Sequence, residues 1–218
     1  MRLLDELQHM LHRTYDLDGT HRVTDFLTMN PALVEALGLS PGSAGAREQL
    51  LVSQQEEDTV DLAVYIAPEV LGRLHESDPL EDLHDGNLDD FWVALEGVSH
   101  FVYLAWNASQ DKPVTRLELE LQAEVDKFVL TALLLAAEQG RAPDALHHGL
   151  FRRCRLDPSL DEAARARYQA ATRYAESYCT RLLERFRRRR NLGALTPELR
   201  RFYRMTQRGK FSLIGASA

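Results

Sequence analysis

Hydrophobic residues recur at helical spacing along most of this chain, and strand-like alternation appears in one short region. Over residues 2–15 the apolar positions return every three or four residues, which predicts an amphipathic helix. A short helix is predicted over 31–38, because an Asn-Pro pair places proline in its first turn. A Pro-Gly-Ser-Ala-Gly loop follows at 41–45, so we expect an N-terminal helical segment over 1–45.

The strand-like region lies between residues 48 and 66. Apolar residues occupy alternate positions on both sides of a polar Glu-Glu-Asp link. This pattern predicts a β-hairpin with strands over 48–55 and 59–66. A lone hairpin is only marginally stable, so it must lie on helices or gain another strand. Residues 21–28 and a second copy of the chain are both candidates for that strand.

From residue 68 onward the pattern is helical. The predicted helices cover 68–74, 88–109, 114–139, a short segment with His147 and His148, 159–190, and a last segment that begins at Thr196. Asn87 is expected to cap the helix that begins at 88, and Thr196 is expected to cap the last helix. Ser159 with Glu162 has the spacing of a capping box. The apolar tail from Phe211 is expected to fray, or to dock onto the bundle or a partner.

These elements define an α-dominated α+β fold, a helical bundle of three to four long helices with a small β-hairpin element near the N-terminal part. The hairpin and the bundle occupy 46–218 and form one compact domain with the N-terminal segment. The helices at 88–109 and 114–139 are separated by a short break, so we expect them to be antiparallel neighbours.

Composition excludes several classes of protein. Of 218 residues, 44% are hydrophobic and 27% are charged, which rules out wholesale disorder. Two cysteines are too few for a disulfide framework. The start of the chain lacks the layout of a signal peptide, and no apolar run is long enough to span a bilayer, so we expect a cytoplasmic protein. Arginine greatly outnumbers lysine, which is typical of a GC-rich bacterial genome.

The first candidate for chemistry is a polar stripe on the predicted helix at 88–109. Glu96, His100, Tyr103 and Asn107 are spaced by four, three and four residues and share one helical face. The rest of this helix is apolar nearly all round, which indicates that it is buried. A buried carboxylate and a buried imidazole need partners or a metal ion.

The next helix and the short helix after it supply potential partners. Glu120 and Glu124 lie four residues apart on one face of the helix at 114–139, and Glu118 and Gln122 lie on a neighbouring face. The candidate metal ligands are Glu96, His100, Glu120, Glu124, His147 and His148. The alternatives stay open at this point: a site for a divalent transition metal, a polar network that fixes helix register, or a solvated acidic face. Glu96 and His100 are also the candidate catalytic pair.

The net charge of −7 hides a strong asymmetry. Residues 1–140 contain 8 basic and 26 acidic side chains, whereas residues 141–218 contain 18 and 7. The candidate binding residues in the basic part are Arg185, Arg187, Arg188, Arg189, Arg190, Arg200, Arg201 and Arg204. Arginine side chains of this density suit an acidic protein partner, a nucleic acid or a second copy of the chain, but they also suit the chain's own acidic part.

Two functions follow from these features. The first is a non-enzymatic interaction subunit without a cofactor, whose arginine-rich C-terminal helices bind an acidic partner, either protein or nucleic acid. The alternative is a helical-bundle enzyme, such as a metal-dependent hydrolase or oxidase, with a buried Glu96/His100 site. Neither set of residues is accompanied by a nucleotide-binding motif, a nucleic-acid-binding motif or the signature of a catalytic triad.

Overall fold

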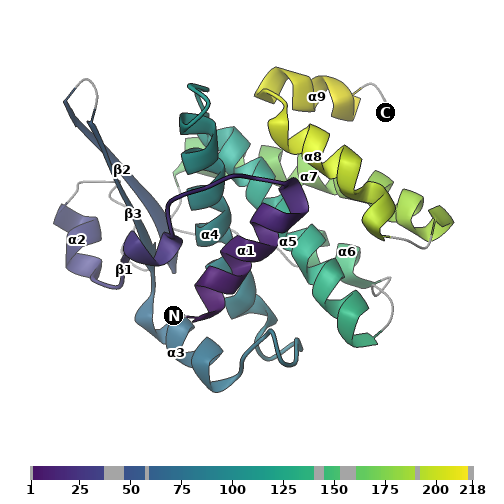
Figure 1. Cartoon of the computed structure of the whole chain (residues 1–218), viewed down its shortest axis with the longest axis horizontal. Coiled ribbons are helices and arrows are strands. Elements are labelled where there is room, and N and C mark those ends of the chain that lie inside the picture. The colour runs from purple at the N-terminus through teal and green to yellow at the C-terminus, as the bar shows by residue number, and fades with distance from the viewer. Residues whose placement is uncertain are drawn as a thin grey trace.

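The computed structural model describes residues 2–36, 47–56, 59–139, 145–152, 161–189 and 192–215. The loop expected at 41–45, the end of the helix expected to reach 38, Ser159 and Arg190 lie outside the described residues. The described part is mostly helical with one small sheet, so the predicted α-dominated α+β fold is confirmed (Figure 1).

The predicted hairpin is present and gains its third strand from the same chain. Strands β2 (Glu48–Glu56) and β3 (Thr59–Ile66) pair antiparallel, and β1 (Leu27–Thr28) pairs parallel with β3. The strand order is β1-β3-β2. Helix α1 (Arg2–Tyr15) precedes the sheet, and η1 (Val23–Asp25) and α2 (Pro31–Ala36) flank β1.

Helix α4 (Leu88–Ala108) is the centre of the molecule. It contacts α1, the hairpin strands, α3 (Pro68–Glu76) and α5 (Arg116–Gln139). Its N-terminal end lies near Thr131 of α5 and its middle lies near Asp126, so the two helices are antiparallel as predicted. The large contact area explains why α4 is apolar on nearly every face.

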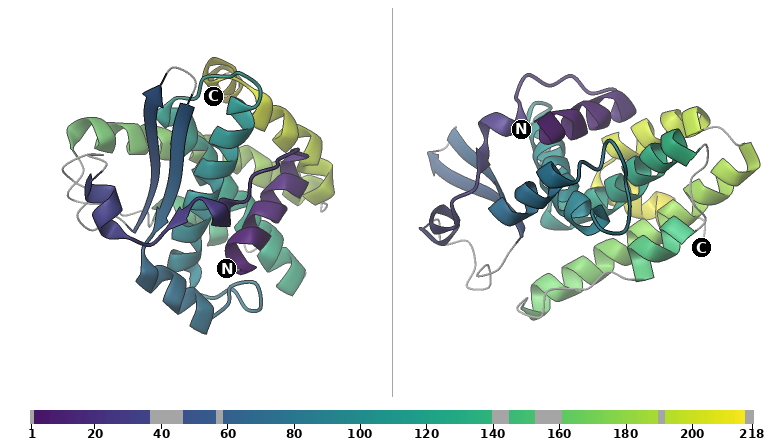
Figure 2. Two further views of the ribbon diagram at one scale, coloured as in Figure 1. Left: turned by 60° about the vertical axis from the view of Figure 1, so that its left-hand side comes forward. Right: turned by 90° about the horizontal axis from the view of Figure 1, so that it is seen from below.

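Helix α7 (Glu162–Arg189) packs along α5, and α6 (Ala145–Arg152) contacts both helices (Figure 2). Ala171, Ala175 and Tyr178 of α7 are fully buried. After η2 (Leu192–Leu195), helices α8 (Thr196–Arg204) and α9 (Gln207–Gly215) lie on the opposite side of the molecule from the sheet.

Three details differ from expectation. Asn87 does not cap α4, because its side chain holds the preceding loop through Ser77, Asp82 and His84. Thr196 is the first residue of α8 rather than its cap. The tail from Phe211 belongs to a helix that contacts α7, with Ile214 buried.

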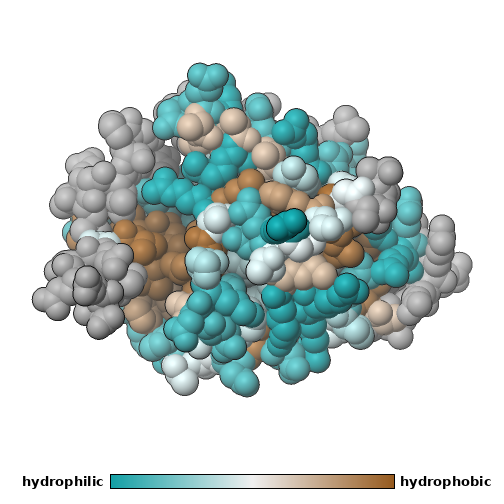
Figure 3. Space-filling model, turned by 90° about the horizontal axis from the view of Figure 1, so that it is seen from above, coloured by the Kyte–Doolittle hydropathy of each residue, from teal (hydrophilic) through white to brown (hydrophobic). Residues whose placement is uncertain are grey.

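The surface carries hydrophobic areas among hydrophilic ones. In Figure 3 the broadest hydrophobic area lies on the left of the view, the side that holds the sheet in Figure 1. Val52 of β2 is 40% exposed. None of the described helices combines the length and apolar composition needed to cross a membrane.

Candidate metal centre

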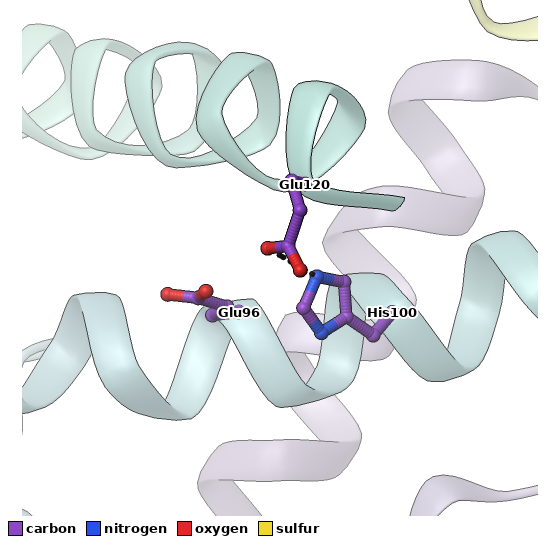
Figure 4. Close-up of side chains that lie close together, drawn as sticks. All are labelled: Glu96, His100 and Glu120. Carbon is purple, nitrogen blue, oxygen red and sulfur yellow. Dashed lines mark ion pairs between the residues drawn. The ribbon is translucent and has the colours of Figure 1, made fainter. Parts of the chain in front are cut away.

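Three candidate ligands converge at the interface between α4 and α5. Glu96 and His100 are one helical turn apart on α4, and Glu120 faces them from α5 (Figure 4). One potential ligand atom from each residue lies within 4.8 Å of the other two. Metal–ligand distances of about 2.0–2.2 Å place donor atoms roughly 3–4.4 Å apart, so small side-chain rotations would close this group around one ion. Glutamate oxygens and imidazole nitrogen suit a divalent transition metal.

Each ring nitrogen of His100 faces the carboxylate of a different glutamate. Its Nδ1 lies 3.3 Å from Glu48 Oε1, and its Nε2 lies 3.6 Å from Glu120 Oε2. The latter distance is too long for a hydrogen bond, so Nε2 is buried without a hydrogen-bond partner among the described residues. A carboxylate that holds the second ring nitrogen is the usual companion of a metal-binding histidine.

Glycine at position 97 allows Glu48 to approach His100. A Cβ atom at this position of α4 would lie 3.1 Å from Glu48 Cγ and 3.2 Å from Val64 Cγ1. Both distances are shorter than ordinary van der Waals contacts. The absent side chain therefore lets the sheet pack closely on α4, which brings Glu48 from β2 to the centre.

Lys127 forms the other side of the cluster. Its Nζ lies 2.7 Å from Glu96 Oε2 and 2.8 Å from Glu124 Oε1. From α7, Arg167 Nε lies 3.9 Å from Glu120 Oε1. The predicted solvated acidic face of α5 is therefore wrong: Glu120, Glu124 and Lys127 are buried.

Burial and neighbouring charges shift the pKa values of these groups. Burial disfavours the imidazolium form of His100, but the carboxylates of Glu48 and Glu120 outweigh burial and raise its pKa well above the usual value. Burial raises the pKa of Glu48 and of Glu124 despite their cationic neighbours. Burial also opposes the charge of Lys127, but Glu124 and Glu96 raise its pKa well above normal. The pKa of Glu96 is lowered, because Lys127 and His100 outweigh its burial.

Other polar residues of the two helices belong to a second network. Asp126 accepts hydrogen bonds from Tyr15, from Ser99 at 2.6 Å and from Gln122 at 2.8 Å. Lys210 of α9 donates to Gln122 Oε1 at 2.7 Å. These bonds connect α1, α4, α5 and α9 and satisfy Asp126, so we assign this network to structure.

The remaining candidate ligands lie elsewhere. His147 Nε2 is 2.9 Å from Thr180 Oγ1 and its ring contacts Phe128, while His148 is exposed. Glu118 caps α5, because its carboxylate accepts from Thr115 N and its own N–H donates to Thr115 Oγ1. Tyr103 and Asn107 share the α4 stripe but lie outside the three-ligand group.

Several basic residues proposed for partner binding form contacts within the chain. Arg185 pairs with Glu198, Arg200 pairs with Asp16, and Arg204 donates to three main-chain carbonyls. Arg201 is exposed. Arg187, Arg188 and Arg189 lie within α7, but their side chains are outside the described part of the structure.

Sequence analysis missed two members of the cluster. Glu48 lies 52 residues from His100 in a strand, where no helical spacing connects them. Lys127 ends the run of acidic residues in α5, and its proximity to Glu96 becomes evident only when α4 and α5 are packed together. Comparison with models of protein families, with curated proteins and with solved structures finds no match to this chain.

Proposed function

We propose that this chain is a metal-binding helical-bundle protein in which Glu96, His100 and Glu120 bind a divalent transition metal. The observation that carries the proposal is the buried Nε2 of His100, which has no hydrogen bond within the described part of the chain and lies 3.6 Å from Glu120 Oε2, while Glu48 lies against Nδ1. A buried polar atom without a partner is unfavourable, and a metal ion would satisfy it. The bound ion would supply the Lewis-acid or redox chemistry of a hydrolase or an oxidase.

The experiment measures metal content and metal uptake. Protein purified without chelator or histidine tag is analysed for transition metals and then titrated with Zn²⁺, Co²⁺ or Mn²⁺. We expect one bound ion in the wild type and in His148→Gln, a control at an exposed histidine outside the group. His100→Gln and Glu120→Gln should lose the ion while far-UV circular dichroism stays unchanged. A wild-type protein that takes up none of these ions contradicts the proposal and leaves the cluster as a polar network.

A second proposed function concerns the basic C-terminal helices. Arg173, Arg201 and Arg208 are exposed, and no ion pair of theirs is found within the described part of the chain. We propose that these residues contribute to binding an acidic surface of a partner protein. Arg201→Glu with Arg208→Glu should abolish a pull-down interaction that weakens as salt concentration rises. If the variant retains every partner in the pull-down, the proposal is contradicted. If the variant loses bound nucleic acid rather than a protein, the partner is a nucleic acid.

A further inference from the structure

Lys127 is a buried cation that contacts two carboxylates beside the candidate metal centre. Its Nζ lies 2.7 Å from Glu96 Oε2 and 2.8 Å from Glu124 Oε1, and its side chain is 9% exposed. Glu96 is also one of the three potential ligands. One carboxylate therefore faces two positions for a cation: the space shared with His100 and Glu120, and the place of the ammonium group.

This arrangement resembles half of a two-metal centre. Two-metal centres hold their ions about 3.5–4 Å apart, and helical bundles supply them with carboxylate ligands from facing helices. At Lys127, Glu96 and Glu124 come from facing helices and converge on one positive group. Glu124 Oε2 is buried without a hydrogen-bond partner among the described residues, so this carboxylate has a spare ligand atom.

The charges of the cluster favour one divalent ion rather than two. The carboxylates of Glu48, Glu96, Glu120 and Glu124 supply four negative charges when ionised. Lys127, Arg167 and one divalent ion balance them, with His100 neutral as a ligand. A second divalent ion beside Lys127 would leave an excess of two positive charges in a buried site, whereas the same ion in place of Lys127 would leave an excess of one.

We propose that the Lys127 ammonium occupies the position of a second metal ion, so that the centre binds a single divalent ion. This inference rests on the metal centre proposed above. It implies that the second position, between Glu96 and Glu124, becomes a metal site when the ammonium group is removed.

The test titrates Mn²⁺ into three proteins and records binding stoichiometry and electron paramagnetic resonance. The wild type should bind one ion with the spectrum of an isolated Mn²⁺. Lys127→Met should bind two ions with the spectrum of a spin-coupled pair, because Glu96 would bridge them. Glu124→Gln retains Lys127 and should still bind one isolated ion at saturation, because Glu124 lies outside the three-ligand group.

The possible outcomes separate the two proposals. A wild type that binds two ions, or a folded Lys127→Met that binds only one, overturns the inference and leaves the metal centre in place. If Lys127→Met does not fold, the ion stoichiometries of the wild type and of Glu124→Gln test the inference instead. Loss of the ion from Glu124→Gln would make Glu124 a ligand of the single ion and would overturn the inference. A wild type that binds no ion overturns the proposed function and this inference together.

Discussion

At the scale of single residues, Lys210 shows how burial shifts the pKa of an ammonium group whose hydrogen bonds go to uncharged side chains. The side chain is fully buried, and Nζ donates to Gln122 Oε1 at 2.7 Å and to Tyr103 Oη at 3.0 Å. Burial lowers the pKa of Lys210 to about 7, although Glu118 and Asp126 oppose the shift. The ammonium form therefore destabilises the folded protein near and below neutral pH.

This shift predicts a pH-dependent stability. Above pH 7 folded Lys210 loses its proton while the unfolded residue keeps it, so unfolding takes up a proton and stability rises with pH. From pH 7 to pH 9 the wild type should gain roughly 2 kcal/mol of unfolding free energy relative to Lys210→Met. The neighbouring Asp126 has its pKa raised by burial to about 6, below this range, and the tyrosines Tyr15, Tyr103 and Tyr203 stay neutral because burial raises their pKa values.

The measurement is urea unfolding across this pH range. Lys112→Met serves as the control, because Lys112 is exposed, and its stability should run parallel to that of the wild type. A difference between wild type and Lys210→Met that does not change with pH would show that the ammonium group is not destabilised by burial.

Glu48 provides a second prediction at the residue scale. Its contact with Nδ1 fixes the orientation of His100, and loss of such a partner typically weakens metal binding about 10–100-fold. Glu48→Gln should therefore raise the dissociation constant for Zn²⁺ by this factor in calorimetric titration. Glu118→Gln removes a buried glutamate that caps α5 and should leave the metal affinity unchanged. Equal affinities in wild type and Glu48→Gln would exclude the orienting role.

At the scale of elements, the approach of the sheet to α4 depends on Gly97. Gly97→Ala should lower the unfolding free energy by about 1–2 kcal/mol, because overpacking against Glu48 and Val64 exceeds the gain in helix propensity. Gly72 in α3 is the matched control, since a Cβ there meets nothing within 4 Å. Gly72→Ala should stabilise the protein by about 0.5–1 kcal/mol. Thermal unfolding of both variants measures the difference, and a stabilised Gly97→Ala would show that the sheet can move away without cost.

The same elements show how far the sequence alone could predict the structure. Apolar spacing identified the hairpin, the long helices and the antiparallel pairing of α4 with α5, because burial of one face follows from that spacing. For the same reason Glu120 was one of several residues of α5 expected as potential partners of Glu96 and His100. The position of Glu48 beside His100 could not be predicted, because the register of β2 and the close approach of the sheet to α4 depend on tertiary packing. The division of the last predicted helix into α8 and α9 was not predicted, because the sequence of α9 mixes glycine, lysine and small residues and its stability comes from contact with the bundle.

At the scale of the whole molecule, the basic C-terminal part closes onto the end of the first helix. Asp16 has φ of 57°, which ends α1 in the left-handed conformation, and Leu17 N donates back to His12 O. Arg204 then donates to Tyr15 O and Asp16 O, both at 2.7 Å. Part of the charge asymmetry is therefore satisfied inside the chain, as cations at the negative end of a helix dipole.

A comparison of Arg204 with Arg201 distinguishes stabilisation of the fold from partner binding. Both arginines lie on α8 and both are exposed, but Arg204 donates hydrogen bonds that hold α8 against α1, whereas Arg201 has none among the described residues. Arg204→Met should lower the unfolding free energy by about 1–3 kcal/mol, and Arg201→Met should change it by no more than about 0.5 kcal/mol. Chemical denaturation of the two variants makes this comparison. Equal stabilities would mean that α8 is held by Arg200 and by its buried residues Leu199, Phe202 and Tyr203, which would leave Arg204 available to a partner.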